Sequence, residues 1–339
     1  MGNNSKLNGV DSIGKHLFMS QIENNMKSFL DWGLLNIGGF INVLRPQTNI
    51  YGNPISILKP TEDPSYTSGQ VWQTMRKDWV WEDTVVFKNT FDPPPSPSPA
   101  PSVIPKLITG IYINNTFYDI ATNDATYKYI VDYINSRIIF DNPIPTNTSV
   151  SMEYAYRWVQ VYNYDNAKWW QQLQYKTDQN AKHFNQIYEG DFSILTNNRI
   201  QLPAIVIETA ARGTSSPFQL GTQSLIMRQD MLLHIVAENM HDRNIIIDIL
   251  RLQQDRTLEL YDINTITTNK TYPFNVNGTL NNNRLRYDQL IDNVNYTWKS
   301  GRLLNIVASD VQSFSPFLSE CTVRMSVEII FGISAQYGV

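Results

Sequence analysis

Cysteine is almost missing from this 339-residue chain, in which Cys321 is the only one. A single thiol cannot form an intrachain disulfide, so burial of apolar side chains must hold the core together. This usage is typical of a protein made in a reducing cytosol. Cys321 lies in a segment where apolar and polar residues alternate, and we therefore expect a buried strand residue without thiol chemistry.

Charge is also scarce, because only 17% of the residues are charged and the formal net charge is −4. Neutralising nucleic-acid phosphates needs clustered Lys and Arg. The sequence has no such cluster, which argues against a protein that binds nucleic acid through a basic surface. Asparagine supplies the polar surface instead, as in 114–115, 197–198 and 281–283. An amide-rich, weakly charged exterior suits a subunit that lies against neighbours without strong like-charge repulsion.

Long apolar runs are missing as well. No uncharged stretch is long enough to span a bilayer, so we expect no membrane partner. The first twelve residues are polar and lack a basic region followed by an apolar one. We therefore expect no signal peptide.

The sequence also lacks common catalytic motifs. The chain has four histidines, and it contains no glycine-rich phosphate loop and no Gly-x-Ser-x-Gly elbow. His234, Glu238 and His241 are the one plausible trio of metal ligands, but their spacing is not His-Glu-x-x-His. We favour an exposed helix start at these positions, and we expect no enzyme, no cofactor and no metal site.

A proline-rich stretch at 92–102 is the clearest boundary in the sequence. Its prolines favour an extended polyproline II spacer over a packed element. On this basis we divide the chain into an N-terminal helix and first strand (1–45), a loop-rich segment with the spacer (46–102), an inserted antiparallel β module (103–164) and a main core (165–339).

Hydrophobic periodicity assigns the elements of these segments. Helical spacing predicts helices at 16–35, 166–184 and 242–252, whereas alternation predicts strands within 107–161. Further strands are expected at 40–44, 202–208, 218–225, 230–237, 258–262, 303–309 and 321–333, and 212–217 reads as a flexible loop. The predicted fold class is α+β, with a small mixed sheet packed against helices and a β module inserted into it.

Tryptophans offer two interpretations. Trp72, Trp79 and Trp81 could form a stacking platform for sugars, together with Trp169 and Trp170. A small unit with few aliphatic residues more often uses such rings as its own core, and we favour that reading. A carbohydrate-binding or carbohydrate-cleaving tail protein remains an alternative.

The order of elements in 1–45 and 166–339 resembles the tail-terminator and tail-completion proteins of tailed bacteriophages. The segments that carry the resemblance are the helix at 16–35, the strands at 202–208, 218–221 and 233–238, the helix at 242–252 and the strand at 321–333. The resemblance implies a structural virion protein of the neck, assembled in the host cytoplasm. It also implies a homo-oligomeric ring, typically a hexamer, that ends the tail tube and joins the tail to the head connector.

Partners follow from the same resemblance. They are other copies of the chain, tail-tube and possibly sheath proteins, connector proteins, and genomic DNA that passes through the ring without sequence-specific binding. Two features depart from the family pattern, namely the inserted β module with its spacer and the long segment 265–302. Either could decorate the ring or mark another collar, baseplate, tail or capsid-decoration protein. The candidate inter-subunit contact residues are Arg212, Gly213, Thr214, Ser215, Asn269, Asn277, Asn281 and Asn282.

Overall fold

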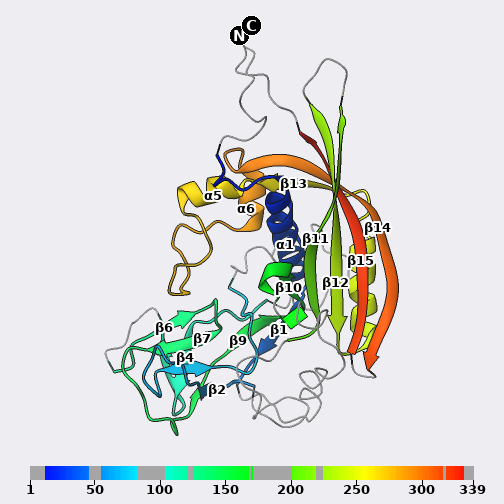
Figure 1. Cartoon of the computed structure of the whole chain (residues 1–339). Helices are drawn as coiled ribbons and strands as arrows, with labels where there is room; N and C mark the ends of the chain where they lie inside the picture. Colours follow the sequence, from blue (N-terminus) through cyan, green and yellow to red (C-terminus); the bar gives the residue numbers. More distant parts are fainter. Residues whose placement is uncertain are drawn as a thin grey trace, which may run out of the picture.

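Long antiparallel strands dominate the computed structural model, which describes residues 12–45, 55–81, 104–120, 126–167, 169–170, 201–218, 224–315 and 318–331. Its described strands form sheets of six, seven and two strands. In Figure 1 the six-stranded sheet curves along one side, and the seven-stranded sheet lies below it on the other side.

The six-stranded sheet has the order β10-β11-β12-β15-β14-β13. Only β10 and β11 are parallel, and the other neighbours are antiparallel. Alternation explains these strands, since Met231, Leu233 and Ile235 are buried on one face. Their bounds are β10 Gln160–Asn163, β11 Ala204–Pro217, β12 Leu225–Ala237, β13 Thr257–Tyr261, β14 Thr297–Ser315 and β15 Leu318–Phe331.

Two helices fill the inner face of this sheet. Helix α1 (Phe18–Asn36) contacts β10, β11 and β13, and helix α4 (Met240–Arg251) contacts β12, β14 and β15. Their apolar residues, such as Met26 and Ile246, join the inward side chains of the strands in one core cluster. Asn239 caps α4 by accepting a hydrogen bond from the Asp242 backbone N–H at 2.8 Å.

The seven-stranded sheet has the order β5-β4-β8-β2-β3-β7-β6. The core cluster packed on this sheet includes the fully buried side chains of Trp72, Trp79 and Tyr154. The prediction that Trp72 and Trp79 are core residues is therefore confirmed. The bounds are β2 Ile57–Pro60, β3 Val71–Gln73, β4 Gly110–Ile113, β5 Thr116–Asp119, β6 Tyr129–Asp132, β7 Arg137–Phe140 and β8 Val150–Ser151.

Two connections join the body built on the six-stranded sheet to the body built on the seven-stranded sheet. The first is the two-stranded sheet of β1 (Phe40–Val43) and β9 (Tyr154–Arg157). The second is the segment that carries α5 (Ile263–Asn269) and α6 (Tyr287–Asp292). Between these helices the bridging loop, residues 270–286, reaches the β6–β7 turn, where the Tyr133 backbone N–H donates to the Gly278 carbonyl at 2.8 Å.

Gly278 is expected to be intolerant of alanine. Its φ is +80°, and a Cβ atom there would overlap the Asp132 carboxylate. Gly278→Ala should lower the free energy of unfolding by about 2 kcal/mol, as urea unfolding would measure. Gly33→Ala is the matched control, because a Cβ at this α1 position meets no atom within 4 Å. It should leave stability unchanged or raise it by up to about 1 kcal/mol. Equal losses would contradict the assignment.

The predicted fold class is wrong, because the described chain is mostly β and has four α-helices. The reason lies in strands that are much longer than alternation indicates. Strand β14 has 19 residues but shifts register after Leu304, Ala308 and Ser313, and each shift breaks the alternation by which a strand is recognised. The loop predicted at 212–217 is also wrong, since these residues belong to β11.

Other predictions are confirmed in the described residues. The helix at 16–35, the strand at 40–44, the alternating strands within 107–161 and the buried Cys321 all appear as expected. The described part of the loop-rich segment 46–102 contributes β2 and β3 to the seven-stranded sheet. The proline-rich spacer and most of the helix predicted at 166–184 lie outside the described residues.

Candidate functional site

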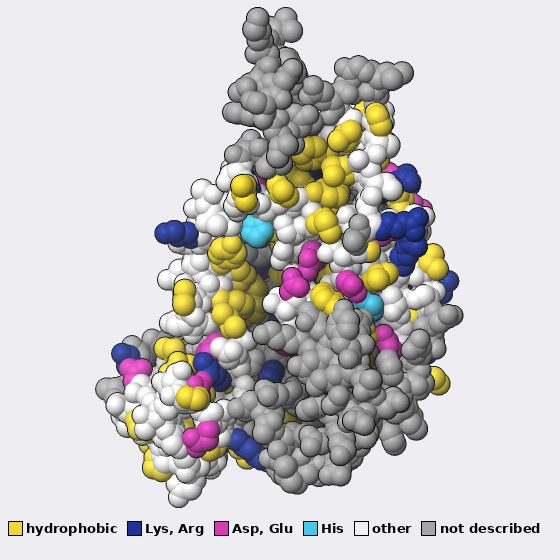
Figure 2. Space-filling model, in the orientation of Figure 1, with side chains coloured by type: hydrophobic (Ala, Val, Ile, Leu, Met, Phe, Trp, Pro, Cys, Tyr) yellow, Lys and Arg dark blue, Asp and Glu magenta, His cyan; other side chains and the backbone are white. Residues whose placement is uncertain are grey.

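The inner face of the six-stranded sheet extends past the start of α1. Beyond that point a row of apolar side chains is only half-buried, and we call it the distal strip. Hydrophobic side chains gather on the visible face at this end of the molecule, near the β11–β12 hairpin in Figure 1 (Figure 2). The distal strip consists of Phe18, Leu225, Met227, Trp298 and Phe331.

Contacts make the distal strip continuous. The ring centroids of Phe18 and Trp298 lie 6.3 Å apart, and those of Trp298 and Phe331 lie 6.5 Å apart. Leu225 pairs with Phe331 across the β12–β15 ladder, so their side chains share one face. The Lys299 ammonium lies 5.6 Å from the Phe331 ring centroid. A contiguous apolar patch of this kind is typical of a protein–protein contact.

An open strand edge adjoins the distal strip. Strand β10 pairs only with residues 204–207 of β11. Further along, residues 213–217 pair with β12 on one side, and no described strand pairs with them on the other. We call residues 213–217 the β11 edge. Its outward backbone groups can accept another strand.

The candidate contact residues fall into two separate groups. Gly213, Thr214 and Ser215 lie in the β11 edge, with Arg212 directly before it, so this group adjoins the distal strip. The asparagines lie in or beside the bridging loop, which contacts the seven-stranded sheet of the same chain.

Hydrogen bonds within the chain already use three of these asparagines. The Asn269 side chain donates to the Tyr296 hydroxyl at 3.1 Å, and Asn281 donates to the carbonyls of Lys270 and Tyr272, each at 2.9 Å. The Asn277 side chain accepts from Thr279. Asn282 is exposed.

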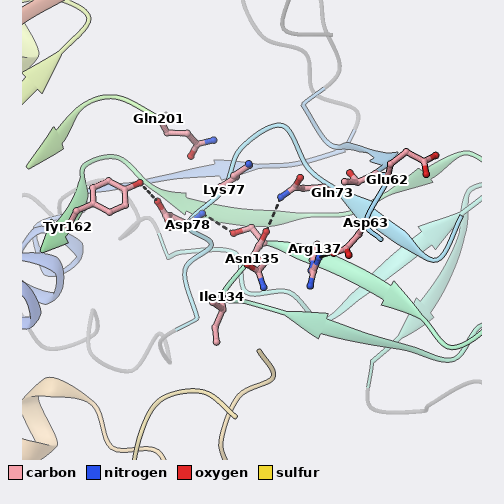
Figure 3. A pocket seen from close by; sticks show the side chains of 12 residues that line it. Glu62, Asp63, Gln73, Lys77, Asp78, Ile134, Asn135, Arg137, Tyr162 and Gln201 are labelled. Carbon is pink, nitrogen blue, oxygen red and sulfur yellow. Dashed lines mark hydrogen bonds and ion pairs between the residues drawn. The ribbon is translucent and has the colours of Figure 1, made fainter. Parts of the chain in front are cut away.

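Two hollows lie where the sheets meet. One, of about 340 Å³, is polar and borders the β6–β7 turn (Figure 3). In this view Tyr162 points toward Asp78 at one end, and Arg137 lies against Asp63 at the other. Arg137 donates to Asp63 at 2.6 Å and to Asp132 at 2.8 Å, so its charge is compensated within the chain. The second hollow, of about 520 Å³, is lined by α1, the bridging loop and Trp81.

A partly buried charge network lies where the two hollows meet, since Asp78 and Tyr162 line both. Arg157 donates to both carboxylate oxygens of Asp31, at 2.6 and 3.1 Å, and to the Trp79 carbonyl at 2.6 Å. Burial raises the pKa of the neighbouring Asp78, whereas Arg157 lowers it. The Tyr162 hydroxyl donates to Asp78 at 3.3 Å. These groups bind one another across the junction, which indicates a structural joint between the two bodies.

The outer face of the six-stranded sheet holds His234, one member of the predicted metal trio. His234 Nε2 lies 2.9 Å from a Glu208 carboxylate oxygen, and Nδ1 lies 3.1 Å from the Thr322 hydroxyl. The Trp170 ring covers the imidazole at a centroid distance of 4.9 Å. Within the described ranges, no three His, Cys, Asp or Glu side chains are arranged to hold a metal ion.

Acid should weaken the fold through His234. Burial lowers the pKa of this imidazole despite the opposing effect of Glu208. The unfolded chain, with a histidine pKa of about 6.5, then binds the proton more readily than the folded chain. Stability should therefore fall as the pH drops below about 6.5. Urea unfolding between pH 5 and 7.5 should show a smaller fall for His234→Gln, and identical pH profiles would refute this role.

Sequence reasoning missed the distal strip and the Arg157 network. The sequence signals one member of the strip, because the apolar alternation that begins at Val323 continues to Phe331. For Arg157, Asp31 and Asp78 no local pattern exists, since tertiary folding brings them together.

Over the described ranges, no helix combines the length and apolar character needed to cross a bilayer. Comparison with protein families and with curated proteins gives no match, either to a family model or to an individual sequence.

Proposed function

We propose that this chain is a structural virion protein of a tailed bacteriophage, which forms a ring of identical copies at the neck. The ring ends the tail tube and joins the tail to the head connector, and six copies are expected. The observation that carries the proposal is the distal strip beside the open β11 edge. Apolar surface and unpaired backbone at one end of a sheet favour assembly with other proteins.

Burial of the distal strip supplies the driving force for assembly. Each Å² of apolar surface that leaves water contributes about 25 cal/mol, and the rings of Phe18, Trp298 and Phe331 are large. The low charge of the chain limits repulsion between copies. A slightly acidic ring also suits a DNA channel, because it does not hold the phosphate backbone.

The five tryptophans of the glycan-binding alternative pack against the chain itself, and Trp169 lies against Tyr162 and Trp170. Trp72, Trp79 and Trp170 are each no more than 2% exposed, so their faces are not available to a sugar. Trp81 lines the larger hollow, where its ring packs against Phe274 at 5.3 Å. We therefore put forward no second function.

Immunogold labelling of intact particles tests the proposal. Antibodies against the purified chain are applied to particles of the phage that encodes it, and the label is located by electron microscopy. We expect gold at the junction of head and tail. Labelling of the baseplate or the capsid surface would contradict the neck assignment, and complete absence from particles would contradict a virion role.

A further inference from the structure

The β11 edge is suited to receive one more strand. Residues 213–217 pair regularly with residues 225–229 of β12, so the side that no described strand covers presents regular extended backbone. Gly213 has no side chain, and those of Thr214, Ser215 and Ser216 are small, so a strand can approach closely. Pro217 has no N–H group and closes the ladder at the hairpin end.

The sequence beyond β15 has the pattern of such a strand. Residues 332–339 lie outside the described residues, and their sequence is Gly-Ile-Ser-Ala-Gln-Tyr-Gly-Val. Apolar residues alternate with small or polar ones, as expected for a strand with one buried face. In β15 the odd-numbered residues from Cys321 to Ile329 face the core, and Ile333, Ala335, Tyr337 and Val339 continue that order.

We propose that residues 332–339 of one copy pair as a strand with the β11 edge of a neighbouring copy. Ile333 and Tyr337 would then cover the neighbour's distal strip. The inference rests on the proposed function, because it requires identical copies to assemble. Eight extended residues span about 26 Å, which is enough to cross an interface and pair with a five-residue edge.

Strand order favours a neighbouring copy over the same chain. Strand β15 ends at Phe331 opposite Leu225, and β12 separates it from β11. A tail pairing with its own β11 edge would have to pass around the β11–β12 hairpin and reverse direction.

The same arrangement explains closure into a ring. Each copy offers one tail and one β11 edge, and these are different surfaces. A contact between different surfaces is head-to-tail, and it generates a ring when the rotation between copies closes. The geometry thus assigns the β11 edge to an inter-subunit contact and residues 332–339 to its occupant.

Disulfide trapping between two variants, each with one introduced cysteine, tests the pairing. The native Cys321 is fully buried, so an introduced cysteine is the reactive thiol of each variant. One preparation carries Ser216→Cys and the other carries Gln336→Cys, and the two are mixed and oxidised under native conditions. We expect a disulfide-linked dimer at several times the yield from either variant alone. A second mixture with Ser334→Cys covers the neighbouring register.

Controls separate specific pairing from random collision. Ser65→Cys places a thiol on an exposed turn before β3, and its mixture with Gln336→Cys should give only background dimer. An excess of a synthetic peptide with the sequence of 332–339 should reduce the dimer yield from the Ser216→Cys mixture. Background yield in both tail mixtures, or a double variant that forms its disulfide only within one chain, would overturn the proposal.

The outcome is independent of where the protein sits in a particle. Trapping is measured on purified chain, whereas the neck assignment is tested by labelling of particles. Gold at the neck without trapping would leave the proposed function standing and refute the strand exchange. Trapping with no label on particles would support the strand exchange and refute the proposed function.

Discussion

Arg157→Ala is expected to lower the free energy of unfolding by about 2 to 3 kcal/mol, because it removes the buried cation of an ion pair whose carboxylate is 25% exposed. Arg157 is 8% exposed, and it binds both Asp31 and the Trp79 carbonyl. Its loss leaves the Asp31 carboxylate without this cation and removes one of the charges that lower the pKa of Asp78. Urea unfolding at pH 7 measures the change.

A double-mutant cycle with Asp31→Ala shows whether the pair itself is responsible. The double variant should lose clearly less than the sum of the two single losses, because neither charge is then left unpaired. Arg302→Ala is the matched control, since the Arg302–Asp255 pair has both side chains 55% exposed. An exposed pair contributes about 0 to 1 kcal/mol. Equal losses for Arg157→Ala and Arg302→Ala would refute the structural joint.

Phe331→Asp is expected to weaken self-association by about 30-fold or more, which corresponds to a hot-spot loss of about 2 kcal/mol. The substitution places a charge in the middle of the distal strip, beside Trp298 and across from Leu225. Burying that charge in an apolar interface is unfavourable, so assembly should need a higher protein concentration. Sedimentation velocity over a concentration series measures the shift.

Ile330→Asp controls for a general effect at the end of β15. Ile330 is 50% exposed and lies on the opposite face of the same strand. Its substitution should leave association within about threefold of the unaltered protein. Circular dichroism and thermal unfolding confirm that both variants are folded. If both variants associate as the unaltered protein does, the distal strip is not the interface.

Local sequence patterns predicted the elements whose burial repeats regularly. Helix α1 follows from apolar residues at helical spacing, including Ile22, Met26 and Phe29, and the same residues pack in the core. The short strands of the seven-stranded sheet follow from alternation such as Ile111 and Ile113. These patterns involve residues that are close in the sequence, so the elements could be predicted from the sequence alone.

Features that depend on distant residues were not predictable in this way. The small α+β core was expected because β14 and β11 each appeared as a short strand beside a loop. The register shifts within β14, and between Thr209 and Gly213 in β11, hide their continuity. The junction of Asp31, Asp78 and Arg157 likewise joins three separate segments.

A mostly β architecture is shared by many unrelated proteins, so function must be argued from the surface and not from the class. The distal strip and the β11 edge carry that argument, because both lie at the end of the sheet farthest from the bridging loop's contact with β6 and β7.

Electron microscopy of particles made without this protein tests the central claim most directly. An early stop codon is introduced into the phage copy of the gene. Host cells are infected with this phage and lysed, and the particles are imaged. The account predicts filled heads and separate tails, or tails of uncontrolled length, with normal particles restored by supplying the protein in trans. Complete, infectious particles in normal number would contradict it.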